Sequence, residues 1–395
     1  MQEFIKLVLK SGKDQSPKRF HPWIFSGAIK KIYGNPEEGD LVQIYSNKDE
    51  YLGIGHYQIG SIAVRIISFE EVIPDAQFWK GKLVQAYETR KAAGLVDNPQ
   101  TNVYRLVNAE GDGMPGLIID FYNGTCVFQI HSIGMYHARE QLIEGLKEIF
   151  GNNLKAVFDK SDSTIPFKSQ IDAKNEYLLK TNPENKVLEY GNTFIIDWEE
   201  GQKTGFFIDQ RENRRLVEYF SKNRRVLNMF GYTGGFSVYA LKGGAETVDT
   251  VDSSAKAIDL CRENIKLNFG EINNHQALAV DAFGFMETVD PKYDLIILDP
   301  PAFAKHHNVL SNALQGYKRL NAKAISKIKK GGILFTFSCS QVVSKENFRK
   351  SVFAAAANTG RKVKILQQLS QPADHPVNIY HPEGEYLKGL VLYVE

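Results

Sequence analysis

Apolar runs separated by glycine-rich and polar segments predict a parallel sheet in the C-terminal half of the chain. Helices are expected between these runs, at 236–241, 254–269 and 316–329, and another should end at Phe220. Because strands and helices alternate, the pattern indicates an α/β fold. The final residues, Leu387–Glu395, would close the sheet as its antiparallel strand. The runs expected to form parallel strands are Val226–Phe230, Thr247–Val251, Leu278–Asp281, Tyr293–Pro301 and Gly331–Ser340.

The N-terminal part has a different pattern, with short strand-like runs such as Leu41–Tyr45 and Ile62–Ile67. The glycines Gly53, Gly55 and Gly60 are interpreted as turns between such runs, so residues 1–72 are expected to form a small β-rich domain.

Residues 73–185 mix both patterns and predict a middle α+β domain. A helix over 77–93 would place Phe78, Leu83, Val84 and Tyr87 on one side. The Asp112-Gly113 pair favours a turn over a site, since this dipeptide is common in chain reversals. The α/β domain would then cover 186–395. Further elements are expected at 104–120 (a glycine-rich reversal between strands), 125–130, 137–150, 156–158 and 187–190.

Composition adds limits on the type of protein. With 395 residues, 43% of them hydrophobic, the chain is long enough for two or three domains. The net charge of +2 suggests no polyanion partner by itself. Three cysteines without Cys-x-x-Cys spacing favour a reducing compartment and no zinc. No signal core or membrane-spanning run is visible, so we expect a soluble, cytoplasmic protein without a membrane partner.

The first part of the N-terminal domain is locally basic. The only acidic residues in this stretch are Glu3 and Asp14, whereas seven residues are basic. The rings of His21, Trp23 and Phe25 lie among these cations. Cations next to stacking rings are what an RNA-binding surface requires. A solvated charged face beside ordinary core aromatics is the alternative. The cations are Lys6, Lys10, Lys13, Lys18, Arg19, Lys30 and Lys31.

Chemistry-bearing residues fall where the predicted parallel strands end. Gly231–Gly235 forms a tight glycine turn before a helix, and Asp252, Asp281, Asp299 and Cys339 follow or end strands. Ligands of open α/β sheets gather at this edge, where a carboxylate about 20 residues after the glycines accepts ribose hydroxyls. The turn lacks the Gly-x-Gly-x-x-Gly spacing, which argues against hydride transfer. The alternative is that the glycine turn only connects a strand to a helix and binds no ligand.

As an ordered set, the strand, glycine turn, acidic strand ends and Asp299-Pro300-Pro301 resemble a class I S-adenosylmethionine-dependent methyltransferase over about 186–395. Lys18-Arg-Phe-His-Pro-Trp-Ile-Phe-Ser-Gly27 resembles the entry to the PUA-type RNA-binding domain of a group of ribosomal RNA methyltransferases. Thr336-Phe-Ser-Cys-Ser340, Asp374-His-Pro-Val377 and Pro382–Lys388 are similar to the members of that group that methylate cytosine C5 in large-subunit (23S) ribosomal RNA.

This resemblance implies a cofactor, S-adenosyl-L-methionine, and roles for individual residues. Asp252 would bind its ribose, Asp281 its adenine amino group, and the glycine turn its methionine part. The segments Gln202–Gly205 and Asp209–Arg211 would wall the pocket, although Asp209 and Arg211 could also be surface charges before a helix. The implied cofactor-binding residues are Gln202, Thr204, Phe207, Asp209, Arg211, Phe230, Gly231, Tyr232, Thr233, Gly234, Asp252, Asp281 and Asp299.

The resemblance also implies the catalytic chemistry. Cytosine C5 is a poor nucleophile, so a thiolate, Cys339, would first add to C6 while Asp299 assists at N3. Pro300, Pro301 and Phe303 would shape a slot for the base, and Lys18, Arg19, His21 and Trp23 would bind RNA. The chain has Ala302 where many relatives have a second cysteine, which puts the product-release step in doubt. For Cys339, a buried structural thiol is the alternative.

Two other functions stay open. Asp-Pro-Pro followed by Phe303 also suits methylation of an exocyclic amine, guanine N2 or adenine N6, which needs no thiol. A non-catalytic RNA-binding ribosome assembly factor is the second alternative. Lys305, His306 and His307 lack acidic or cysteine partners, so a solvated loop over 302–315 is expected and no metal. The methylated nucleotide, the base that removes the C5 proton and the assembly, including a homodimer, stay undetermined.

Overall fold

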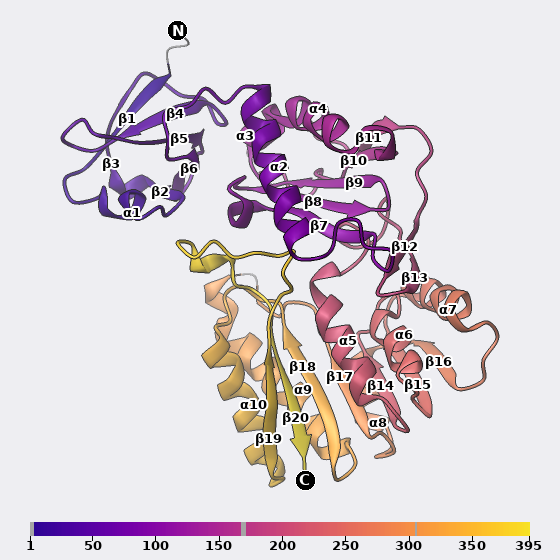
Figure 1. The fold of residues 1–395 in the computed structure, drawn as a ribbon. Helices are drawn as coiled ribbons and strands as arrows, with labels where there is room; N and C mark the ends of the chain where they lie inside the picture. Colours follow the sequence, from indigo (N-terminus) through magenta and orange to yellow (C-terminus); the bar gives the residue numbers. More distant parts are fainter. Residues whose placement is uncertain (1–3, 167–170, 305) are drawn as a thin grey trace. The chain divides into compact units, whose positions relative to one another are not determined.

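The computed structural model describes residues 4–166, 171–304 and 306–395 (Figure 1). These residues fold into two compact units, and each unit uses several stretches of the chain. The first contains the described residues up to Leu188 together with Ile196–Ile208 and Ala373–Gly384. The second contains Glu189–Ile195, Asp209–Pro372 and Glu385–Glu395. Lys305, expected in the loop after Pro301, lies outside the described residues.

The first unit begins with a sheet in the order β2-β6-β5-β4-β1-β3. It confirms the β-rich N-terminal domain, but Gly53 and Gly55 lie inside β5 and not in turns. A Cβ atom on Gly55 would come within 2.3 Å of the Arg65 carbonyl oxygen, so close approach of β6 explains this glycine. The elements are β1 Ile5–Leu9, α1 Gln15–Lys18, β2 Trp23–Phe25, η1 Ser26–Ala28, β3 Ile29–Tyr33, β4 Leu41–Tyr45, β5 Tyr51–Tyr57 and β6 Ile62–Ser68.

A second sheet in this unit, in the order β11-β10-β9-β8-β7, is packed against α2 and α4. The helix α2 buries Trp79, Leu83, Ala86 and Arg90, whereas Val84 is exposed, contrary to the predicted face. The elements are α2 Ala76–Ala92, β7 Val103–Asn108, η2 Ala109–Asp112, β8 Leu117–Tyr122, β9 Thr125–Ile130, α3 Ile133–His137, α4 Arg139–Phe150, η3 Gly151–Asn153, β10 Ala156–Asp159 and β11 Glu176–Lys180.

The reversal between β7 and β8 is stabilised by buried ion pairs. Arg90 pairs with Asp112, and Arg105 donates to Asp120 over 2.8 Å. Gly113 adopts a φ of 66°, which confirms the turn. These charges therefore fix the backbone of the first unit. A short two-stranded sheet follows, formed by β12 Lys186–Glu189 and β13 Asn192–Ile195.

The second unit holds the predicted α/β sheet, in the order β16-β15-β14-β17-β18-β20-β19. Pairing is parallel from β16 to β18, and β20 is antiparallel to β18 and β19. The elements are η4 Ile208–Gln210, α5 Arg211–Phe220, β14 Arg225–Met229, α6 Gly235–Lys242, β15 Thr247–Asp252, α7 Ala255–Phe269, β16 His275–Ala279, α8 Ala282–Thr288, β17 Leu295–Leu298, η5 His307–Val309, α9 Leu310–Lys327, β18 Gly332–Ser338, α10 Lys345–Thr359, β19 Val363–Leu369 and β20 Lys388–Val394. The short helix η6 Pro382–Gly384 belongs to the first unit.

Two predictions in this unit need correction, and one strand was not predicted. The third strand lies earlier, at His275–Ala279, and Asp281 caps the helix that follows. The loop expected to reach Gln315 ends sooner, because α9 begins at Leu310. The edge strand β19 was not predicted, since its residues between the ends are exposed and offer no apolar run.

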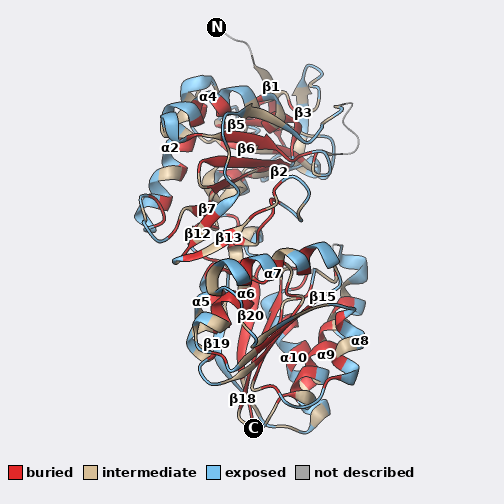
Figure 2. Ribbon diagram, turned by 90° about the vertical axis from the view of Figure 1, so that its right-hand side faces the viewer, coloured by how far each residue is buried: buried red, intermediate tan, exposed pale blue. Residues whose placement is uncertain are grey.

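Apolar side chains cover both faces of this sheet. In β17, Ile296 and Leu298 contact one core with α8, α9 and α10, whereas Leu295 and Ile297 contact the other core with α5 and α6. Figure 2 shows these strands buried between helices whose outer faces are exposed. Burial on both faces explains the continuous apolar runs. None of the helices in the described part of the chain has the length and apolar character that a bilayer crossing requires.

Candidate active site

The glycine turn after β14 is tight because neighbouring elements leave no space for side chains. The Gly234 amide donates to the Gly231 carbonyl over 2.8 Å. A Cβ atom on Gly231 would lie 2.3 Å from Thr250, and one on Gly234, whose φ is 81°, would lie 2.5 Å from the Cys261 sulfur. Phe230 and Tyr232 have positive φ values of 59° and 45°. The turn is therefore a strained backbone loop next to a helix N-terminus, as expected for a ligand-binding loop.

Asp252 connects the glycine turn to the start of α7. Its Oδ2 accepts from the Tyr232 amide and its Oδ1 from the Ser254 amide, both over 2.9 Å. Thr233 is buried, and its carbonyl accepts from Asn264 over 3.0 Å. The carboxylate is only partly buried, and each oxygen retains a lone pair, so it can also accept ribose hydroxyls.

Asp281 lies at the N-terminus of α8, where its Oδ2 accepts from the Gly284 amide over 2.6 Å. The side chain is exposed and can accept a further hydrogen bond. Nearby aromatic rings form a row: Phe283 lies 5.8 Å from Phe230 and 6.1 Å from Phe303, measured between ring centroids. Phe303 in turn lies 4.5 Å from Tyr317. This row offers an apolar wall for planar ligands.

Asp299 and Cys339 follow adjacent parallel strands, β17 and β18, in which Leu298 pairs with Thr336. Both therefore lie at the same edge of the sheet. Burial, and then the charge of Asp209, raises the pKa of Asp299 to about 7. Burial, followed by the charges of Asp299 and Asp209, raises the pKa of Cys339 to about 12. Cys339 is partly accessible, unlike the fully buried Cys126 and Cys261. After Asp299, Pro300 is buried and Pro301 is exposed.

Hydrogen bonds hold the segment that carries Cys339. The Ser338 hydroxyl donates to the Tyr317 hydroxyl over 2.9 Å, and that of Ser340 donates to the Ala304 carbonyl over 2.6 Å. The Lys388 ammonium donates to the carbonyls of Ser340 and Val343 over 2.5 and 2.6 Å. Burial lowers the pKa of Lys388 to about 8. Lys388 thus holds the loop after Cys339 and brings a cation close to it.

The segment before α5 contributes a second carboxylate and a positioning amide. Asp209 accepts from the Tyr386 hydroxyl over 2.7 Å, and its other oxygen is buried without a hydrogen-bond partner among the described residues. Gln210 hydrogen-bonds to Asp299 and accepts from Asn213 over 2.6 Å. A buried, unsatisfied carboxylate oxygen is costly, which favours a ligand donor at this position.

Arg211 and Arg214 are buried and face the same carboxylate. Arg211 lies 3.5 Å from Glu189, and Arg214 lies 2.7 Å from it. Gly235 packs against the Arg214 side chain, since a Cβ atom there would lie 3.1 Å from it. Arg214 therefore supports the glycine turn, Arg211 shares its carboxylate partner Glu189, and direct contact of Arg211 with a cofactor stays a prediction.

Gln202, Thr204 and Phe207 belong to the first unit. The Thr204 hydroxyl donates to Asp120 over 2.6 Å and contacts the Tyr122 hydroxyl at 2.8 Å. Gln202 is exposed and Phe207 is partly buried. The roles of these three residues in cofactor binding stay predictions.

The predicted RNA-binding residues also lie in the first unit. Lys18 pairs with Asp14 and Glu50, whereas Arg19 is exposed. The His21 Nε2 atom lies 3.6 Å from Glu383, and the Trp23 indole donates to Glu110 over 2.8 Å. Their roles stay predictions.

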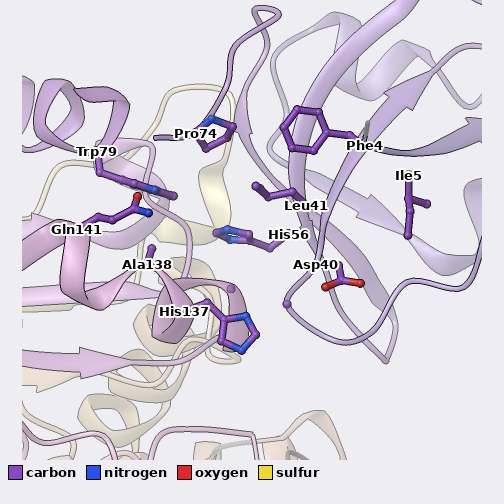
Figure 3. A pocket seen from close by; sticks show the side chains of 12 residues that line it. Phe4, Ile5, Asp40, Leu41, His56, Pro74, Trp79, His137, Ala138 and Gln141 are labelled. Carbon is purple, nitrogen blue, oxygen red and sulfur yellow. The ribbon is translucent and has the colours of Figure 1, made fainter. Parts of the chain in front are cut away.

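A pocket of about 400 Å³ lies elsewhere in the first unit (Figure 3). Phe4, Leu41, His56, Trp79, His137 and Gln141 line it, and none of the predicted site residues does. Burial lowers the pKa of His56 to about 3, so its ring is neutral. Within residues 4–166, 171–304 and 306–395, no group of three His, Cys, Asp or Glu side chains could hold a metal ion.

The second-unit residues fit S-adenosylmethionine. Glycines that admit no Cβ atom expose backbone at the turn, Asp252 has free lone pairs, and Asp281 and Phe283 provide an acceptor beside a ring. The carboxylates of Asp209 and Asp299 match a positively charged sulfonium group.

Comparison with known proteins agrees with this fit. The family model of S-adenosylmethionine-dependent methyltransferases matches residues 159–379, and a PUA-like domain model matches residues 7–69. Ribosomal RNA large subunit methyltransferase I of Aeromonas salmonicida (strain A449) is 39% identical, over 99% of this chain and 99% of that protein. The chain belongs to this methyltransferase family.

Family membership confirms the predicted class I fold with its PUA-like N-terminal domain, and S-adenosylmethionine as the cofactor. A solved structure from Streptococcus mutans, described as a SAM-dependent methyltransferase, superposes with a TM-score of 0.84 at 24% identity, over 99% of this chain and 100% of that one. A structure of a methyltransferase complexed with SAH has the same scores and coverage. At this identity the two structures show the fold alone.

Sequence reasoning missed three residues around Cys339 and Asp299. Tyr317, Tyr386 and Lys388 support these residues or Asp209 from distant parts of the chain. Tyr386 and Lys388 lie in the segment Pro382–Lys388 that carries the family resemblance, but the sequence gave them no individual role. Contacts across such sequence distances are not visible in periodicity.

Proposed function

We propose that the chain transfers a methyl group from S-adenosylmethionine to C5 of a cytosine in 23S ribosomal RNA. The observation that carries this proposal is the common sheet edge of Cys339 and Asp299 on adjacent parallel strands. The identity to a ribosomal RNA large subunit methyltransferase over nearly the whole chain supports the substrate class.

In the proposed reaction, Cys339 acts as the nucleophile. Its raised pKa means that the resting side chain is a thiol, which must lose its proton before the sulfur bonds to C6. Asp209, whose charge acts on Cys339, is the carboxylate that we assign to accept this proton. Asp299, with a pKa of about 7, donates a proton to N3, so that electron density reaches C5.

The bound cofactor supplies an electrophilic methyl group to C5. The protein's own residues would hold it, with Asp252 at the ribose, Asp281 at the adenine amino group, and the Gly231–Gly235 backbone at the methionine part. A base then removes the C5 proton, and its electron pair restores the C5–C6 double bond as the Cys339 sulfur leaves as a thiolate. N3 returns its proton to Asp299, and the thiolate regains a proton from Asp209. Pro301 and Phe303 would form the slot for the extruded base.

Exocyclic-amine methylation is the competing activity, because the ring row around Phe303 also suits a purine. That chemistry needs no thiol. A non-catalytic assembly factor would bind RNA and transfer no methyl group. The three-domain division at residues 72 and 185, the cytoplasmic location and a homodimer stay predictions.

Mapping the transferred methyl group tests the proposal. Ribosomal RNA from cells that lack the protein is incubated with purified enzyme and radiolabelled S-adenosylmethionine, and the modified nucleoside is identified by mass spectrometry. We expect 5-methylcytidine. A label on guanine N2 or adenine N6 would establish the competing activity, and no label on RNA would favour the assembly factor.

A further inference from the structure

The first unit contains exposed aromatic rings from two distant parts of the sequence. Phe20 lies two residues after the end of α1, and Tyr380 comes from the segment 373–384, which follows the second-unit strand β19. Their ring centroids lie 5.3 Å apart. Phe20 is 47% exposed, Tyr380 is 50% exposed, and the neighbouring Ile379 is 86% exposed. Large rings that stay exposed side by side are uncommon unless they bind something.

The backbone holds both rings in place. Phe20 adopts a φ of 63°, a strained value for a residue other than glycine, and its amide donates to the Pro17 carbonyl over 2.9 Å. The Phe69 ring packs edge-on against Phe20 at 5.4 Å. The amide of Tyr380 donates to the Asn378 side chain over 3.0 Å. Little conformational entropy would thus be lost when a ligand stacks on these rings.

The segment 373–384 is fastened to the rest of the first unit. The Arg105 amide donates to the Asp374 carboxylate over 3.0 Å, and the Asn108 side chain donates to the Pro376 carbonyl over 3.0 Å. Gly111 packs so closely on Pro376 that a Cβ atom would lie 2.0 Å from its carbonyl oxygen. The segment is therefore a fixed part of this unit's surface.

Further rings extend from Phe20 and Tyr380 toward the N-terminal sheet, and together these rings form an aromatic array. The His381 ring lies 4.3 Å from Trp23 and 5.5 Å from His21, which places two predicted RNA-binding residues against the segment 373–384. Trp23 is followed by Phe25 at 6.3 Å, and Phe25 is 47% exposed.

The charges around the array favour a polyanion. Within residues 4–31 the described cations far outnumber the single acid, Asp14, and most of them make no ion pair with a described residue. Exposed cations whose charge is not neutralised by an acidic side chain can contact phosphate. Those without an ion pair are Lys10, Lys13, Arg19, Lys30 and Lys31.

We propose that Phe20 and Tyr380, extended by Ile379, form a stacking platform for unpaired bases of the RNA substrate. This inference rests on the proposed function for the identity of that RNA and adds the segment 373–384 to the RNA-binding surface. Bases stack on aromatic rings in a sequence-tolerant way, while neighbouring cations hold the backbone.

The test is the affinity of the full chain for a fluorescein-labelled single-stranded RNA oligonucleotide, followed by fluorescence anisotropy. Loss of one stacking ring typically weakens binding by about tenfold, so Tyr380→Ala and Phe20→Ala should each have an effect of this size. Tyr380→Trp keeps a ring and should bind like the wild type. The matched control is Tyr219→Ala, which removes another exposed tyrosine, in α5 of the second unit, and should change nothing.

Two results would overturn the inference: equal affinities of the Tyr380→Ala and Tyr219→Ala variants, or no binding of RNA by the wild type. Calorimetric binding of S-adenosylhomocysteine, measured on every variant, reports whether the second unit is still folded. A wild type that binds the oligonucleotide through these rings but methylates no RNA would overturn the proposed function and leave this inference standing.

Discussion

The sheet edge of the second unit and the aromatic array of the first unit use side chains in opposite ways. At the sheet edge, Asp299, Asp209 and Cys339 are partly buried, and burial raises the pKa values of Asp299 and Cys339. In the array, Phe20 and Tyr380 are about half exposed, and five of the seven cations within residues 4–31 make no ion pair with a described residue. Chemistry on one atom needs desolvated groups, whereas capture of a long polyanion needs accessible rings and charges. Substitutions at the sheet edge should therefore change the rate of methyl transfer, whereas substitutions in the array should change the affinity for RNA.

The largest effect should come from Cys339→Ala. If the sulfur bonds to C6, methyl transfer should fall by a factor on the order of 10⁴ or more, because losing a nucleophile removes the main reaction path. Single-turnover transfer of radiolabelled methyl groups to ribosomal RNA measures this. Cys126→Ala, which changes a buried cysteine of the first unit, is the control and should retain turnover. Activity that survives Cys339→Ala would support amine methylation.

Asp299→Asn should have the next largest effect, a loss of about 10²–10⁴ in methyl transfer, which is the usual contribution of general acid catalysis. The amide keeps the size of the side chain but has no proton to transfer to N3. The same single-turnover assay measures it. Unchanged turnover would remove Asp299 from the proposed reaction.

A stability measurement controls for the folding of that variant. Because the pKa of Asp299 is raised from 3.8 to about 7, the folded state holds a proton that the unfolded chain has released. The contribution of this group to the free energy of unfolding should therefore decline as the pH rises through this window. Urea unfolding of Asp299→Asn should lack this part of the pH dependence.

Asp252→Ala should weaken S-adenosylhomocysteine binding by roughly tenfold to hundredfold, the range for losing hydrogen bonds to a charged group. The substitution also frees the amides of Tyr232 and Ser254, so the glycine turn loses its anchor. Isothermal titration calorimetry measures this change. The exposed Asp259 on α7 is the matched control, and Asp259→Ala should bind normally.

Arg19→Ala should have the smallest effect, a loss of a few-fold in RNA affinity with unchanged turnover at saturating RNA. If Arg19 contacts one phosphate, the slope of log affinity against log salt should change by about 0.7, the value for one contact on a single strand. Anisotropy titrations at several salt concentrations measure it. An unchanged slope would place Arg19 outside the RNA interface.

The sequence predicted the second unit better than the first. Strands such as β14 and β17 are buried on both faces and give continuous apolar runs, and the residues that follow them lie at one edge by the rule for parallel sheets. The positions of Asp252, Asp299 and Cys339 at the ends of strands therefore follow from the sequence pattern. Asp281 was assigned to the wrong element because β16 is only partly buried and its end is not marked by apolar residues.

The array of the first unit could not be predicted in the same way. Its second half, 373–384, is separated from Phe20 by most of the chain, and no periodicity links Tyr380 to a β-rich domain that precedes it. The same limit applies to Lys388 and Tyr386, which reach the surroundings of Cys339 and Asp209 only through tertiary packing. Local patterns specify elements, whereas contacts of this kind depend on the folded chain.

The central claim, a bond between the Cys339 sulfur and C6 of a cytosine, can be tested by trapping the adduct. Fluorine at C5 cannot leave as a proton does, so RNA that contains 5-fluorocytidine should stay attached to the enzyme after methyl transfer. We predict a denaturation-resistant complex that requires S-adenosylmethionine, with the nucleotide located by mass spectrometry on the peptide that contains Cys339. Efficient methylation of unmodified RNA without any such complex, or attachment to another residue, would contradict the account.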